Sequence, residues 1–134
     1  MKTLIVEDEF TNRLLLQKLL APYGESNIAI NGKEAIFAFR SALDSGAPYS
    51  LICLDIMMPE MDGREALKLI REIEQERGIL STDGVRIFMT TALGDLKSIA
   101  NAFQDLCDGY LIKPIKQANL LTLLKEHGLV EDAA

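Results

Sequence analysis

Four short apolar runs of the sequence are each followed closely by residues that can bind a metal ion or a phosphoryl group. The residues that follow the runs are Glu7, Asp8 and Glu9 after residues 3–6, Asp55 after 51–54, Thr91 and Ala92 after 85–89, and Lys113, with Pro114 behind it, after 110–112. Such apolar runs are typical of buried parallel β-strands. Open α/β sheets bind their ligands beyond the carboxyl ends of the strands. We therefore expect three carboxylates, a hydroxyl and an ammonium to meet at one sheet edge.

The three carboxylates are those of Glu7, Asp8 and Asp55, and a cation has to offset their mutual repulsion. Two like charges about 4 Å apart repel by about 1 kcal/mol in bulk water, and several-fold more in a partly desolvated pocket. Oxygen-only ligands suit a hard divalent ion, and Mg²⁺ commonly takes one or two carboxylates together with a phosphoryl oxygen. The sequence therefore predicts a Mg²⁺ site, with Lys113 as a second positive charge.

A carboxylate beside a divalent cation and an ammonium can act as a nucleophile toward a phosphoryl group. The cation and Lys113 would neutralise the oxygens of the transferred group, so that catalysis is mostly positioning and electrostatics. The Thr91 hydroxyl and the Ala92 backbone N–H would hold a further phosphoryl oxygen. These residue types predict phosphoryl transfer onto Asp55.

The elements that must position these residues alternate regularly along the chain. Amphipathic spacing predicts helices after each apolar run, and a weaker strand lies near 27–30. The expected helices span about 10–21, 31–43, 64–75, 95–107 and 117–127. Five strand–helix repeats in this order predict an α/β fold, a doubly wound parallel sheet with helices on both faces.

Length and composition exclude several classes of protein. The 134 residues suit one domain, and 49% of them are hydrophobic, which is enough for one core. The net charge of −6 argues against nucleic acid as a partner, because phosphate binding needs clustered Lys and Arg. No apolar stretch is long enough for a signal peptide or a membrane span. We therefore expect a cytoplasmic protein with two reduced cysteines, Cys53 and Cys107, and no membrane contact.

The segment Asp55-Ile-Met-Met-Pro59-Glu-Met-Asp62-Gly63 has the pattern D-x-x-x-P-x-x-D-G. With Glu7-Asp8, Thr91-Ala92 and the segment Gly109 to Pro114 in register, the chain resembles the response regulator receiver domain family over nearly its whole length. The resemblance implies a CheY-like fold, which is flavodoxin-like, with five strands in the order 2-1-3-4-5 and five helices. It also implies a receiver domain over 1–129 and a short acidic tail over 130–134, with no output domain.

The resemblance implies a role for each matching residue. Asp55 would be the phosphoacceptor, supplied by a sensor histidine kinase or a histidine phosphotransfer protein. Asp8 would ligate Mg²⁺ directly and Glu7 mostly through water, while the Met57 backbone carbonyl completes the coordination. Thr91 and Lys113 would bind the phosphoryl group, and the Lys113–Pro114 peptide would be cis. Such a protein catalyses only its own phosphorylation and dephosphorylation, so it is not an enzyme acting on another substrate.

Tyr110 matches the switch aromatic of the family. Phosphorylation would draw Thr91 toward the site, and the Tyr110 ring would move inward. The face formed by the fourth helix, fifth strand and fifth helix would then change its affinity for a downstream protein target. One departure concerns the first acidic pair, because Glu7-Asp8 stands where the family often has Asp-Asp.

Three other functions have to be weighed against a phosphorylated receiver. A phosphohydrolase of the haloacid dehalogenase type needs a second carboxylate two residues after the nucleophile, where this chain has Met57. A flavin-binding module needs a Ser/Thr/Gly-rich loop after the first strand, where this chain has acids. The alternative that stays open is a degenerate receiver that binds proteins without phosphorylation. The complete set of Asp55, Thr91 and Lys113 argues against it.

Overall fold

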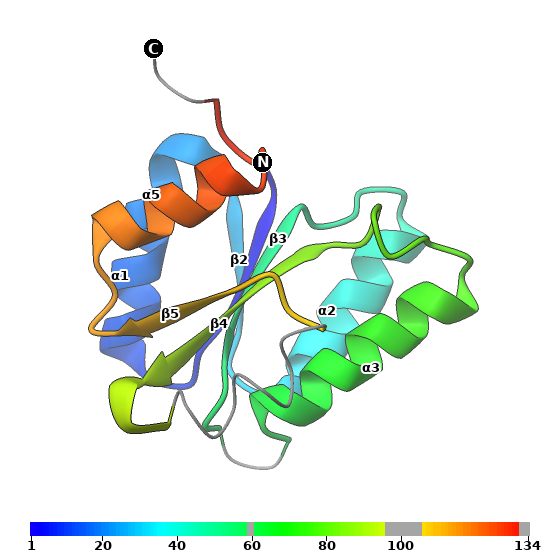
Figure 1. The fold of residues 1–134 in the computed structure, drawn as a ribbon. Helices are drawn as coiled ribbons and strands as arrows, with labels where there is room; N and C mark the ends of the chain where they lie inside the picture. The colour runs from blue at the N-terminus through cyan, green and yellow to red at the C-terminus, as the bar shows by residue number, and fades with distance from the viewer. Residues whose placement is uncertain (59–60, 96–105, 132–134) are drawn as a thin grey trace.

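The computed structural model describes residues 1–58, 61–95 and 106–131, and the side chain of Leu93 is left out of the description. Within these ranges the chain is a five-stranded parallel sheet with helices on both faces (Figure 1). The strands are β1 (Thr3–Val6), β2 (Ser26–Ala29), β3 (Leu51–Asp55), β4 (Arg86–Ala92) and β5 (Gly109–Lys113). Their order is β2-β1-β3-β4-β5, which confirms the predicted α/β class and strand order.

In the described part of the chain, four α-helices and two 3-10 turns accompany the strands. The α-helices are α1 (Phe10–Leu20), α2 (Gly32–Asp44), α3 (Gly63–Glu76) and α5 (Gln117–Glu126), and the turns are η1 (Ala21–Tyr23) and η2 (Leu93–Asp95). The fourth helix expected over 95–107 falls mostly on residues outside the description. Where its ends are described, Asp95 belongs to a 3-10 turn and Cys107 is not helical.

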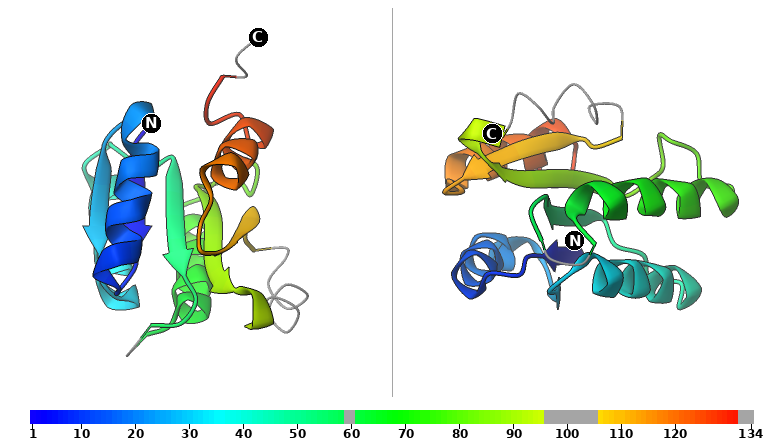
Figure 2. Two further views of the ribbon diagram at one scale, coloured as in Figure 1. Left: turned by 90° about the vertical axis from the view of Figure 1, so that its left-hand side faces the viewer. Right: turned by 90° about the horizontal axis from the view of Figure 1, so that it is seen from below.

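Two apolar clusters fill the space between the sheet and the helices. Leu16 and Leu20 of α1 and Leu120 and Leu124 of α5 pack on one face of the sheet. The α2 and α3 helices pack on the other face, around Phe39. Seen along the sheet, α1 and α5 lie on one side and α2 and α3 on the other (Figure 2, right). This two-sided covering explains why the central strand β3 is fully buried.

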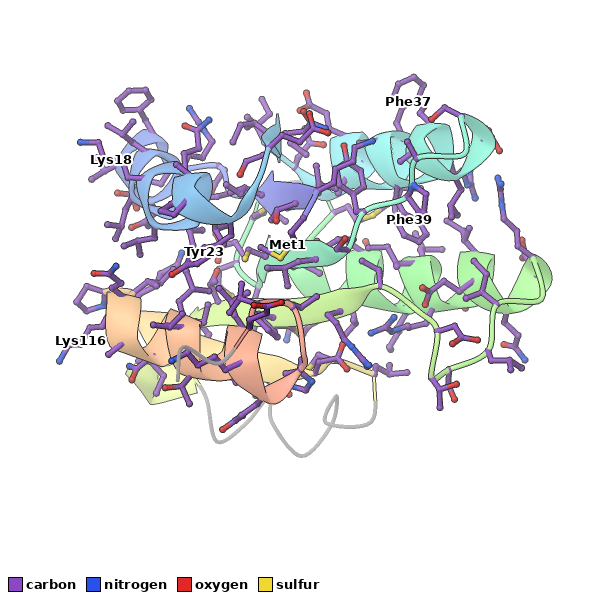
Figure 3. The ribbon with its side chains drawn as sticks, turned by 90° about the horizontal axis from the view of Figure 1, so that it is seen from above. Met1, Lys18, Tyr23, Phe37, Phe39 and Lys116 are labelled. Atoms are coloured by element: carbon purple, nitrogen blue, oxygen red, sulfur yellow. The ribbon has the colours of Figure 1, made fainter. Side chains whose placement is uncertain are left out.

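The α2 helix shows how its sequence separates a buried face from an exposed one. Phe39 is 1% exposed and Phe37 is 74% exposed, and in Figure 3 the two rings point to opposite sides of the helix. The helix begins where the Asn31 side chain accepts a hydrogen bond from the Glu34 backbone N–H, at 2.8 Å. Such a cap satisfies one of the N–H groups that the first turn leaves unpaired.

The strand β4 differs from the sequence prediction. It was expected over 85–89, but it runs from Arg86 to Ala92. Thr90 and Thr91 pair with Leu111 and Ile112 of β5, so that these polar residues lie inside the sheet and not in the loop after it. The two threonines are buried, and β-branched residues fit a pleated surface well.

The parallel strands bring their carboxyl ends to one edge of the sheet (Figure 2, left). Asp55 and Lys113 are the last residues of β3 and β5, and Glu7 directly follows β1. Within the described ranges, no helix has the length and apolar character needed to cross a bilayer.

Candidate functional site

Three carboxylates meet at the carboxyl edge of the central strands. One oxygen from each of Glu7, Asp8 and Asp55 lies within 4.8 Å of the other two. Glu7 is completely buried and Asp55 is 2% exposed, whereas Asp8 is exposed. The site is therefore a pocket with two buried acids at its base and one acid at its mouth.

Lys113 supplies the positive charge of this pocket. Its Nζ lies 3.0 Å from Glu7 Oε1 and 3.1 Å from Asp55 Oδ1. The ammonium thus reaches from the edge strand β5 past the end of β4 and bridges the two buried carboxylates. The peptide bond that follows, between Lys113 and Pro114, is cis.

Burial and close contact separate the pKa values of the two buried acids. Burial, together with the contact and negative charge of Glu7, raises the pKa of Asp55 to about 8, and Lys113 opposes this effect only in part. Burial is also the largest influence on Glu7, but the contacts with Asp55 and Lys113 outweigh it and lower the Glu7 pKa. The same two carboxylates raise the pKa of Lys113 against the effect of its burial. At neutral pH and without a metal ion, the carboxyl groups of Glu7 and Asp55 therefore hold one proton between them, mainly on Asp55.

The donor set fits a hard divalent cation. Glu7 Oε2 is buried and, among the described residues, has no hydrogen-bond partner. A buried acceptor of this kind usually has a water or an ion beside it. Three carboxylates from two strand ends, with no nitrogen or sulfur ligand, match the chemistry of Mg²⁺.

Arg13 of α1 holds the first acidic pair in place. Its Nη1 donates hydrogen bonds to the backbone carbonyls of Glu7, at 3.2 Å, and of Asp8, at 3.1 Å. The turn between β1 and α1 is therefore tied to the helix that follows it. Arg13 could not be singled out from the sequence, because one arginine in an amphipathic helix has no distinguishing pattern.

Gly63 lies directly against the backbone of Asp55. Its N–H donates to the Ile56 carbonyl at 2.9 Å, and a Cβ at this position would lie only 2.2 Å from the Asp55 carbonyl oxygen. Asp62, the residue before it, accepts hydrogen bonds from the Arg64 and Glu65 backbone N–H groups and caps α3. The motif Asp62-Gly63 therefore packs the start of α3 onto the end of β3. No local pattern indicates this contact, because it forms only when α3 packs against β3.

The remaining residues expected at the site lie around the three acids. The Met57 backbone N–H lies 3.4 Å from Asp55 Oδ1, and its side chain is 62% exposed. Thr91 is buried, and its hydroxyl donates a long hydrogen bond of 3.4 Å to the carbonyl of Ala92. Ala92 itself is an exposed residue. Pro59 of the sequence motif lies outside the described residues.

Tyr110 lies on β5 with its ring packed against the core cluster under α2 and α3. Burial is the main cause that raises the pKa of its hydroxyl, and contact with the Cys107 thiol adds to it. In the parallel register Tyr110 pairs with Met89 of β4, two residues before Thr91. Since side chains alternate along a strand, Thr91 and Tyr110 project from the same face of the sheet.

The chain is similar to known proteins in its sequence and in its structure. The response regulator receiver domain family matches residues 3–125. The chain is 33% identical over 127 residues to the osmosensing histidine protein kinase SLN1 of Saccharomyces cerevisiae, covering 93% of this chain and 10% of SLN1. It is also 33% identical over 120 residues to the probable transcriptional regulator ycf27 of Pyropia yezoensis, covering 89% of this chain and 44% of ycf27. The chain thus spans less than half the length of these relatives.

Solved structures agree with the sequence matches. A chain from the co-crystal structure of the S. cerevisiae phosphotransfer protein Ypd1 with the receiver domain of Ssk1 superposes with a TM-score of 0.78 and 30% identity, covering 96% of this chain and 88% of that chain. A putative response regulator from Chloroflexus aurantiacus superposes with a TM-score of 0.73 and 27% identity, covering 94% and 95% of the two chains. Together with the acidic pocket and the strand order, these matches show that the chain belongs to the response regulator receiver domain family.

Proposed function

We propose that this receiver domain accepts a phosphoryl group on Asp55, with Mg²⁺ bound by the acidic pocket. The observation that supports the proposal most strongly is the placement of the Asp55 carboxyl. It is almost completely buried, lies 3.1 Å from Lys113 Nζ, and shares a cluster of ligand atoms with Glu7 and Asp8. A carboxylate with these neighbours has the surroundings that a phosphoryl acceptor needs.

Each residue of the pocket has a distinct part in the proposed reaction. An Asp55 oxygen attacks the phosphorus of a phosphohistidine or an acyl phosphate, and the bond from phosphorus to the leaving nitrogen or oxygen breaks. Bound Mg²⁺ would neutralise charge on the carboxylates and on the transferred oxygens. It would be held by Asp8 and Asp55, by Glu7 mainly through water, and by the Met57 backbone carbonyl. Lys113 pairs with the phosphoryl group, and the Thr91 hydroxyl and the Ala92 N–H bind its oxygens.

The phosphoryl group reaches Asp55 from a sensor histidine kinase or a histidine phosphotransfer protein. The co-crystal structure of Ypd1 with the Ssk1 receiver domain supports this class of partner, because that receiver is similar to this chain. Exposed apolar side chains that follow the acids closely along the chain offer such a donor a docking surface. Phe10 and Leu14 of α1 are 66% and 38% exposed, and Met57 is 62% exposed beside the acids.

Phosphorylation then changes the affinity of a separate surface for a downstream protein. Thr91 and Tyr110 project from the same face of β4 and β5, so a movement of Thr91 toward the phosphoryl group would free space beside the Tyr110 ring. The proposed surface is formed by β5, α5 and the fourth helix of the family, whose expected position lies mostly outside the described residues. A two-state element biased by one charged group explains this kind of switch.

Acetyl phosphate tests the proposed reaction without any partner protein. We expect the wild-type protein to gain the mass of one phosphoryl group in the presence of Mg²⁺, and to gain none in EDTA. The Asp55→Asn variant should gain none under either condition. A wild-type protein that folds, binds Mg²⁺ and stays unmodified would instead support a degenerate receiver that binds proteins without phosphorylation.

A further inference from the structure

Thr90 carries a buried hydroxyl that the proposed reaction does not use. The residue is 1% exposed, and its Oγ1 has no hydrogen-bond partner among the described residues. A buried hydroxyl without a hydrogen bond destabilises the fold, so such an atom calls for an explanation. In the described part of the chain, the other buried side-chain oxygens without a hydrogen bond of good geometry are those of Glu7, in the acidic pocket.

The sheet register places Thr90 in one row with the acids of the pocket. Thr90 of β4 is the direct partner of Asp55 in β3. Val6 of β1 pairs with Leu54 of β3, so Glu7 comes opposite Asp55 from the other side. Neighbouring strands lie about 4.8 Å apart. Asp55 is thus flanked by Glu7 on one side and by Thr90 on the other.

The side chains of this row project from the same face of the sheet. Ile5, Cys53 and Phe88 belong to the cluster beneath α1 and α5. Glu7, Asp55 and Thr90 each come two residues later in their strands or just beyond, and side chains alternate with a period of two. Thr91 projects from the opposite face, so the two adjacent threonines have different surroundings.

We propose that Thr90 is a positioning residue for Asp55, which it orients by donating a hydrogen bond from its hydroxyl to the Asp55 carboxylate when Mg²⁺ is bound. This inference rests on the proposed function, since it concerns the same pocket. In the structure, the Asp55 carboxyl contacts Glu7 and Lys113. With Mg²⁺ bound, the Asp55 carboxyl would be ionised and would have an acceptor position to spare for a hydroxyl donor, and Thr90 is its cross-strand neighbour.

Two substitutions separate the hydroxyl of Thr90 from its shape. Thr90→Val keeps a β-branched side chain of similar size and removes the hydroxyl, whereas Thr90→Ser keeps the hydroxyl. Thr3→Val is the matched control, because Thr3 is a buried threonine at the start of β1, whereas the acids of the pocket follow the end of that strand. The readout is the dissociation constant of Mg²⁺ measured by isothermal titration calorimetry, together with the melting temperature in EDTA.

We expect Thr90→Val to weaken Mg²⁺ binding by about three- to tenfold, which corresponds to the loss of one hydrogen bond. Thr90→Ser and Thr3→Val should stay within about twofold of the wild type. In EDTA the melting temperature of Thr90→Val should be equal to or higher than that of the wild type, because the Thr90 hydroxyl has no hydrogen-bond partner among the described residues. A purely structural hydroxyl would instead lower the melting temperature and leave Mg²⁺ binding unchanged.

Three outcomes would overturn the inference. They are wild-type Mg²⁺ affinity in Thr90→Val, equal weakening in Thr90→Val and Thr90→Ser, and a wild-type protein that binds no Mg²⁺. The last outcome also removes the proposed function. A wild-type protein that binds Mg²⁺ but accepts no phosphoryl group overturns only the proposed function, because the role of Thr90 is measured by metal binding.

Discussion

Replacing Asp55 by asparagine should stabilise the metal-free protein. Burial and Glu7 raise the pKa of Asp55 from 3.8 to about 8, so at neutral pH the folded state holds a proton that the unfolded state has released. At about 1.4 kcal/mol per pH unit, the interval from 3.8 to 7 corresponds to about 4 kcal/mol in favour of the unfolded state. Asparagine carries no charge, so Asp55→Asn removes this cost.

The expected gain in the free energy of unfolding is smaller than the cost that the substitution removes. The asparagine amide is still buried, and burying an imperfectly paired amide costs about 1–3 kcal/mol. Loss of the Asp55 contact leaves Lys113 with Glu7 as its partner, at 3.0 Å. We therefore expect Asp55→Asn to raise the free energy of unfolding by about 1–3 kcal/mol at pH 7.

Urea denaturation in EDTA, followed by far-UV circular dichroism, measures this difference. The Asp55 contribution to stability is fully present below pH 3.8 and is lost as the pH rises to about 8, because the folded-state pKa is the higher one. The gain of Asp55→Asn should therefore increase between pH 5 and pH 8. Asp44→Asn is the control, since the Asp44 side chain is 65% exposed and should show no such trend.

Saturating Mg²⁺ should reduce the difference in free energy of unfolding between Asp55→Asn and the wild type, because ligand binding stabilises the wild type more than the variant. A variant that is less stable than the wild type at pH 7 in EDTA would refute the reasoning. So would a gain that is the same at pH 5 and pH 8.

Three further predictions concern the ion pairs of Arg71, the packing of Gly63 and the proton held by Asp55. Arg71→Met should lower the free energy of unfolding by about 3 kcal/mol, because Arg71 binds the buried Glu74 carboxylate at 2.7 Å, Asp108 at 3.1 Å and the Leu106 carbonyl at 2.7 Å; equal stability in urea denaturation would contradict it. Gly63→Ala should slow phosphorylation by acetyl phosphate by roughly ten- to hundredfold, because the new methyl group displaces the Asp55 backbone; an unchanged rate would show that α3 can shift freely. The affinity for Mg²⁺ should fall as the pH is lowered from about 8 to 6, because the cation displaces the proton held by Asp55; calorimetry that finds the same affinity at both pH values would contradict the raised pKa.

Much of the fold and of the pocket could be predicted from the sequence. The apolar run Leu51–Leu54 is short and bounded by polar residues, so it predicts both a buried strand and the position of Asp55 at its end. The same reasoning places Lys113 at the end of β5. Parallel topology then brings the two residues together, and the structure gives their distance as 3.1 Å.

The parts that the sequence did not reveal depend on contacts between distant segments. Thr90 was expected beyond the end of a strand because it is polar, yet the pairing with Asp55 and Leu111 extends β4 through it. Arg71 and Asp108 are separated by 37 residues, and no local pattern indicates their ion pair. The lack of a side chain at Gly63 has its effect only when α3 packs against β3.

The most direct measurement of the central claim is to locate the phosphoryl group after reaction with acetyl phosphate and Mg²⁺. Borohydride reduction followed by tandem mass spectrometry of peptides identifies the modified residue. We expect a single modified aspartate, Asp55, in the wild type, and no modification in EDTA. Modification of another residue, or the same modification pattern in Asp55→Asn, would contradict the assignment of this pocket as the phosphoacceptor site.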